Sequence, residues 1–168
     1  KQSEISKYRS NMPIDAQKKK FEDYIARKQE AKLRAAAKTL EYVGLKSVAE
    51  MRTSGRYNDY TDRTGNLRSS TGFAVVLNGK QIAGSHFTAV SSNAHEGSAA
   101  GKAHAEETTS KVPNTKMALV IVAGMEYAEY LDNPANPHGR NVMTTTKELA
   151  KKEAEKRLTQ IGFKVIEQ

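Results

Sequence analysis

The chain has 168 residues, a formal net charge of +8 and no cysteine. Without cysteine there is no disulfide scaffold, no thiol nucleophile, and no Cys-ligated zinc or iron–sulfur centre. The longest apolar run, Met117 to Ala123, is far shorter than the roughly 18 residues of a membrane-spanning helix, so the sequence excludes a membrane span. The length fits one domain, and the polar opening of the chain predicts no secretory signal.

The positive charge is concentrated near the amino terminus. Residues 1–46 hold 12 Lys and Arg against 6 Asp and Glu, a net charge of +6, whereas residues 117–168 hold 7 of each. This distribution favours a basic helix that lies on an acidic partner or a phosphate backbone, and a merely solvated helix face stays open.

A polar arm over residues 1–14 is predicted to precede a long amphipathic helix from Ala16 to Val43. Asp15 is the expected cap, and Gly44 is the expected end of the helix. Such a helix is roughly 44 Å long, about as long as a compact domain of this size is wide. We therefore expect a neighbouring subunit to cover part of its apolar stripe.

After a polar connector, residues 61–70 predict a short helical turn that leads into a strand over residues 73–77. Asn78 and Gly79 are typical of a type I′ turn, and residues 80–83 form the expected partner strand. Residues 84–116 form a polar insertion with few large apolar side chains, so this segment is expected to be flexible or to be ordered by a partner.

The rest of the chain predicts a buried strand over residues 117–123, a helical turn over 126–132 and a second helix capped by Thr144 or Thr145. Gly162 is expected to end that helix, and a last strand is predicted over residues 163–166. The predicted domain, residues 15–168, is α+β: a small, mainly antiparallel sheet of about four strands, with the amino-terminal and carboxy-terminal helices packed on one face.

No catalytic, cofactor or metal site is predicted, because the familiar signatures are missing. The histidines do not have the spacing of metal ligands and are expected to be exposed in loops; they are His86, His95, His104 and His138. A magnesium nuclease built on Asp59, Asp62 and Glu126 is a weaker alternative, since capping and solvation explain these carboxylates equally well.

Four tyrosines, Tyr57, Tyr60, Tyr127 and Tyr130, are either interface anchors or half-buried packing residues; packing is favoured for Tyr127. No sequence-specific nucleic-acid motif is present, yet the basic charge keeps open the alternative of a nucleic-acid-binding module without sequence specificity.

Two segments together resemble the tail-completion or neck proteins of tailed bacteriophages. The first is Tyr60-Thr61-Asp62-Arg63-Thr64-Gly65-Asn66-Leu67-Arg68-Ser69-Ser70, and the second is Val120-Ile121-Val122-Ala123-Gly124-Met125-Glu126-Tyr127-Ala128-Glu129-Tyr130-Leu131. The resemblance covers roughly residues 15–168, and departs from the family at residues 84–116 and 132–141.

The motif residues are expected to shape and pack the fold and not to take part in catalysis. Arg63, Thr64 and Gly65 are expected to turn the chain tightly. Leu67 is expected to plug the sheet edge, and Arg68 to cap or pair across a boundary. Gly124 is expected to allow a close approach, with Tyr127 packed beneath it and Tyr130 in the following turn.

The resemblance implies a non-enzymatic structural protein without a cofactor. It would be a subunit of a homo-oligomeric ring, of roughly six or twelve copies, in the head–tail connector of a phage or prophage. Its partners would be other connector, portal or tail proteins, with possible non-specific DNA contact and no membrane. It would be found in the neck or tail region of the virion, and in the host cytoplasm during assembly. The candidate basic interface consists of Lys18, Lys19, Lys20 and Arg27.

Overall fold

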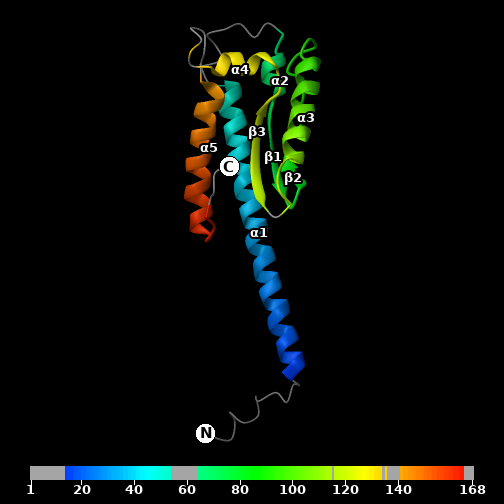
Figure 1. Cartoon of the computed structure of the whole chain (residues 1–168), viewed down its shortest axis with the longest axis vertical. Helices are drawn as coiled ribbons and strands as arrows, with labels where there is room; N and C mark the ends of the chain where they lie inside the picture. The colour runs from blue at the N-terminus through cyan, green and yellow to red at the C-terminus, as the bar shows by residue number, and fades with distance from the viewer. Residues whose placement is uncertain (1–13, 54–63, 115, 134, 136–140, 165–168) are drawn as a thin grey trace, which may run out of the picture. The chain divides into compact units, whose positions relative to one another are not determined.

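The computed structural model describes residues 14–53, 64–114, 116–133, 135 and 141–164 (Figure 1). The chain divides into two units, Lys1–Ala35 and Ala36–Gln168. Within the described part, no helix is long and apolar enough to cross a membrane.

Helix α1 spans Ile14–Thr53, so its residues 14–35 belong to the first unit and its residues 36–53 to the second. In the first unit every described residue except Ala16 is exposed. In the second unit α1 buries Ala36, Leu40 and Val43, which follow one another at steps of four and three. The amphipathic helix is therefore confirmed, although only its second part buries apolar residues.

The expectation that α1 ends at Gly44 is wrong. A Cβ atom on Gly44 would lie 2.3 Å from Cδ2 of Phe73, a core residue that is 1% exposed. The glycine therefore allows close contact between helix and sheet, and the helix continues for two further turns to Thr53. Asp15 lies in the first turn of α1, inside the helix, and not at a position before it.

The sheet has three antiparallel strands in the order β2-β1-β3. They are β1 (Thr71–Leu77), β2 (Lys80–Gly84) and β3 (Met117–Ala123). Asn78 (φ 52°) and Gly79 (φ 72°) both have positive φ between β1 and β2, which confirms the predicted hairpin turn. The α+β class is confirmed. The prediction of about four strands is not, since Phe163 and Lys164 are not in a strand and residues 165 and 166 lie outside the described residues.

One face of the sheet is covered by α1 and by α5 (Val142–Gln160), as predicted. Phe73 and Val75 of β1 share a core cluster with Leu40 and Val43 of α1, and α5 completes it. The residues that α5 contributes are Ala150, Ala154 and Leu158. Gly162 has φ 78°, and the N–H of Phe163 donates to the carbonyl of Leu158 at 2.9 Å, so the helix ends at this glycine as expected.

The other face of the sheet is covered by α3 (His95–Ser110), within the segment predicted to be flexible or to be ordered by a partner. That prediction is wrong, because the segment packs within its own chain. Ala105 of α3 shares a cluster with Ala74 and Val76 of β1 and with Val120 and Val122 of β3, and Phe87 and Val112 pack against it. Figure 1 shows α3 (green) alongside the strands.

Two short helices lie next to the ends of the strands. Helix α2 (Asn66–Ser70) leads directly into β1, as the predicted helical turn does, and α4 (Tyr127–Asp132) follows β3. A third core cluster joins them: Leu67 of α2 packs with Met51 of α1, Ala128 of α4 and Val142 of α5.

Candidate functional site

The two segments that carry the resemblance lie side by side. The N–H of Gly124 donates to the carbonyl of Ser70 at 3.1 Å, and Thr71 pairs with Ala123 at the start of the β1–β3 ladder. Helix α3 is the third member of this arrangement, since a Cβ on Gly124 would lie 2.5 Å from the carbonyl oxygen of Ala100. We call Thr64–Thr71, Gly124 and residues 97–101 of α3 the motif junction.

The turn at the start of the motif junction has the expected geometry. Gly65 has φ 79°, a left-handed conformation that other residues adopt at a cost. The Thr64 hydroxyl oxygen accepts from the N–H of Asn66 at 3.2 Å, and the Thr64 carbonyl accepts from the Ser91 hydroxyl at 2.8 Å. Leu67, expected to plug the sheet edge, is 2% exposed and lies in a core cluster with residues of α1, α4 and α5. Arg63 lies outside the described residues, and Arg68 is half-buried.

Asn66 joins α2 to α3, a role that the sequence analysis missed. Its side-chain oxygen accepts from the N–H of Gly97 at 3.0 Å, and its side-chain nitrogen donates to Glu96 at 3.2 Å. Backbone approaches backbone here, since a Cβ on Gly97 would lie 2.0 Å from the carbonyl oxygen of Asn66. A signal was present in the sequence, because the buried residues of α3 recur at steps of four: Gly97, Gly101, Ala105 and Thr109.

Arg52 ties the end of α1 to the first residue of β1. Its Nε donates to the Thr71 hydroxyl oxygen at 3.1 Å, and its Nη2 donates to the Thr71 carbonyl at 2.9 Å. Burial lowers the pKa of Arg52, but a guanidinium stays charged at neutral pH. The contact therefore orders the entry to the sheet and supplies no proton for chemistry.

The tyrosines of α4 face solvent. Tyr127 is 40% exposed and Tyr130 is 59% exposed, whereas their neighbour Ala128 is 8% exposed. Ala128 therefore takes the buried position on α4, and the packing of Tyr127 beneath Gly124 stays a prediction. Tyr57 and Tyr60 lie outside the described residues.

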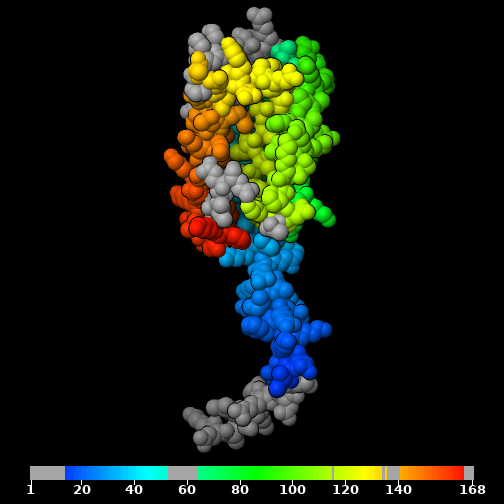
Figure 2. Space-filling model, in the orientation of Figure 1, coloured from blue at the N-terminus to red at the C-terminus, as the bar shows by residue number. Residues whose placement is uncertain are grey.

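An open depression of about 450 Å³ lies beside β3. It is lined by Ile121, Val122 and Ala123 of β3, by His104 of α3 and by residues of α4 and α5. Part of it can be followed in Figure 2, where atoms of β3 lie between those of α3 (green) and α5 (orange). Its walls are mixed apolar and polar.

The carboxylate that lines this depression has a structural role. The Asp132 oxygens accept from the N–H of Met143 at 2.7 Å, from the N–H of Thr144 at 3.1 Å and from the Thr144 hydroxyl at 2.8 Å. Asp132 therefore caps α5, and the prediction that Thr144 or Thr145 is the cap is wrong. Asn141, the residue before α5, makes no capping side-chain bond.

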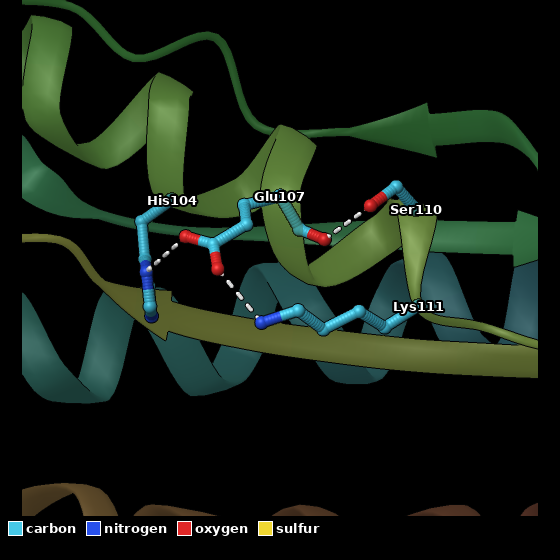
Figure 3. A network of polar contacts seen from close by, with 4 residues as sticks. All are labelled: His104, Glu107, Ser110 and Lys111. Carbon is cyan, nitrogen blue, oxygen red and sulfur yellow. Dashed lines mark hydrogen bonds and ion pairs between the residues drawn. The ribbon is translucent and has the colours of Figure 1, made fainter.

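His104, at the rim of the depression, belongs to a surface network on α3 (Figure 3). Its Nδ1 lies 3.9 Å from Glu107 Oε2, and Lys111 donates to Glu107 Oε1 at 2.7 Å. The hydrogen bond from Lys111, with its positive charge, lowers the pKa of Glu107. His86, His95 and His104 are exposed, but His95 and His104 lie on α3 and not in loops.

The remaining metal and nuclease candidates form no cluster among the residues that the structure describes. Within the part of the chain that the structure describes, no group of three or more His, Cys, Asp or Glu residues could hold a metal ion. Glu126 is exposed, and Asp59, Asp62 and His138 lie outside the described residues.

The candidate basic interface lies on α1 in the first unit, and its four side chains are exposed. They do not share a face, because consecutive helical residues are rotated by about 100°. Lys19 and Lys20 point about 100° and about 200° away from Lys18 around the helix axis, and Arg27 shares a side with Lys20. Lys19, Lys20 and Arg27 therefore lie within an arc of about 100°, and Lys18 lies outside it, so the four predicted side chains do not form one contact face.

Nothing among known protein families, curated proteins or solved structures matches this chain.

Proposed function

We propose that the protein is a non-enzymatic structural subunit of a homo-oligomeric ring in the head–tail connector of a tailed phage or prophage. It would act by subunit contacts in the neck or tail region of the virion, with connector, portal or tail proteins as neighbours. It would pass through the host cytoplasm during assembly.

The observation that carries this proposal is the motif junction. Two segments about 50 residues apart in the sequence meet through the Gly124–Ser70 hydrogen bond and the Thr71–Ala123 pair, so they form one structural unit. The roles of their residues are buried contacts and turns, which fits architecture better than catalysis.

A second observation fits an assembling protein. In residues 14–35 of α1, five large apolar or aromatic side chains are between 37% and 83% exposed. They are Ile14, Phe21, Tyr24, Ile25 and Leu33. Apolar side chains gathered on one exposed helix typically mark a surface that another chain covers.

The test is the absolute mass of the full chain in solution, measured by light scattering across concentration and salt. We expect a closed multimer, of roughly six or twelve copies, since heterologous contacts that close by rotation form rings. The Tyr24→Ser/Leu33→Ser variant, which changes two of these exposed side chains, is expected to shift the mass towards the monomer. The Ile82→Ser/Leu149→Ser variant, which changes two other exposed apolar residues, is the matched control and is expected to leave the mass unchanged.

A monomer at every concentration, together with DNA affinity that falls steeply with salt, would overturn the ring proposal. That result would favour the alternative of a basic nucleic-acid-binding module, for which counterion release is the expected signature.

A further inference from the structure

One side of α1 in the first unit combines apolar and basic side chains without any acidic one. Six residues follow one another at steps of four and three, the spacing of a helix seam. They lie within an arc of about 80° around the helix axis. We call them the apolar-basic face: Ile14, Lys18, Phe21, Ile25, Lys28 and Lys32.

The acidic residues of the same segment lie outside this arc. They are Asp15, Glu22, Asp23 and Glu30. Glu22 reaches towards the face from outside the arc, and its contact with Lys18 is a 4.0 Å ion pair between side chains that are 62% and 74% exposed. Such exposed pairs are worth little and exchange readily. Lys28 lies 5.4 Å from the ring centre of Tyr24, a contact that leaves its charge unneutralised.

We propose that the apolar-basic face binds an acidic amphipathic helix of a partner protein. Leucine-like side chains of the partner would cover Ile14, Phe21 and Ile25, which are 83%, 64% and 37% exposed. Glutamate or aspartate at the alternate seam positions would pair with Lys18, Lys28 and Lys32. This proposal does not depend on the ring, because it concerns only residues 14–32 of α1.

The same face of a second copy is a poor occupant. In a parallel pair, Lys18, Lys28 and Lys32 would each meet their own counterpart. In an antiparallel pair centred on residue 23, Lys18 would meet Lys28. Either arrangement places like charges together in the seam, where they are destabilising.

Nucleic acid and an anionic membrane fit less well. A phosphate backbone would pair with the lysines but leave Phe21 and Ile25 without an apolar partner. A helix that lies on a membrane separates an apolar face from a charged one, whereas here the lysines alternate with the apolar residues along one seam. An acidic amphipathic helix satisfies both kinds of side chain.

The test titrates the full chain against a labelled synthetic helical peptide, read by fluorescence anisotropy. The peptide carries leucine and glutamate along one face at steps of four and three. We expect saturable binding that weakens as salt rises, since the pairs are exposed. The Lys18→Glu/Lys28→Glu/Lys32→Glu variant should bind at least about tenfold more weakly.

The matched control is Lys19→Glu/Lys20→Glu/Arg27→Glu, which changes the net charge equally but on other sides of the helix. It should change the affinity by less than about threefold, and circular dichroism should show the same helix content in both variants. The Phe21→Ser/Ile25→Ser variant should also weaken peptide binding. Because this variant keeps the charge, its effect would show that the apolar side chains contribute to the affinity.

Equal weakening by the two charge variants would overturn the proposal, since net charge and not the face would then govern binding. So would the absence of saturable peptide binding. The peptide could also fail to bind while duplex DNA or anionic vesicles bind in a way that depends on the apolar-basic face. That result would assign the face to the DNA or to the membrane instead. None of these outcomes depends on the mass of the multimer, so this proposal and the ring proposal can fail separately.

Discussion

Gly44 shows how a single residue type misleads when its surroundings are unknown. A glycine after an amphipathic stretch is typical of a helix end, so the sequence predicted one. The structure instead places Gly44 mid-helix against Phe73, where a Cβ would lie 2.3 Å from the ring. The sequence contains both residues, but their contact joins positions 29 apart and is invisible to local patterns.

Gly44→Ala is therefore expected to destabilise the protein even though alanine is the better helix former. Overpacking a core site costs roughly 1–3 kcal/mol, more than the roughly 1 kcal/mol that alanine gains in helix propensity. Urea unfolding should show a lower midpoint. The double variant Gly44→Ala/Phe73→Leu should recover part of the lost stability, because leucine leaves more room for the added methyl group. If Gly44→Ala alone were more stable than the parent protein, that result would contradict the close contact with Phe73.

At the scale of elements, the sequence predicted where α5 starts but not which residue caps it. A threonine-rich stretch before an apolar stripe correctly indicated a helix near residues 144–145, and α5 begins at Val142. The cap itself comes from Asp132, the last residue of α4. Because residues 133–141 separate the cap from the helix, a search for local capping patterns could not find it.

Asp132→Ala should cost roughly 1–2 kcal/mol in the free energy of unfolding, since it removes the acceptor for the N–H groups of Met143 and Thr144. Asp132→Asn keeps an acceptor and should lose less, mainly the interaction between a negative charge and the helix dipole. Thermal unfolding measures both. Glu129→Ala, in the same short helix, is the control, and equal losses at the two positions would argue against the cap.

Helix α3 was missed because its burial does not depend on large apolar side chains. Gly97 and Gly101 bring its backbone against α2, and only Ala105 contributes an apolar side chain to the cluster beyond them. Composition scales count side-chain surface, so they underestimate an element that packs by backbone proximity. The glycine spacing of four was the available signal, but its meaning depends on the partner helix.

For the whole molecule, the sequence predicted the α+β class, the hairpin, β3 and the two helices on one face of the sheet. From the resemblance it singled out Thr64–Ser70 and Gly124 of the motif junction, but not residues 97–101 of α3. It predicted neither the contact between Ser70 and Gly124 nor the role of Asn66. Long-range contacts of small polar residues have no periodic pattern, whereas the apolar repeats that define strands and helices do.

The three core clusters all lie in the second unit, with Ala36 as their first member along the chain. A chain that begins at Ala36 is therefore expected to fold alone, with cooperative urea unfolding and nearly the same midpoint as the full chain. It should lose the affinity for the acidic peptide completely. Non-cooperative unfolding of this shorter chain would show that residues before Ala36 contribute to the core.

The two glycines of α3 also bear on the order in which the molecule folds. Each lowers helix propensity by roughly 1 kcal/mol relative to alanine, so residues 95–110 have little tendency to form a helix before the surface they pack against exists. That surface is built from α2, β1 and β3, and the β1–β3 pairing joins residues at least 40 positions apart, from Leu77 with Met117 to Thr71 with Ala123. We therefore expect α3 to order late, after the slow step of bringing these strands together, and to be the first part of the sheet's cover to open in the native state.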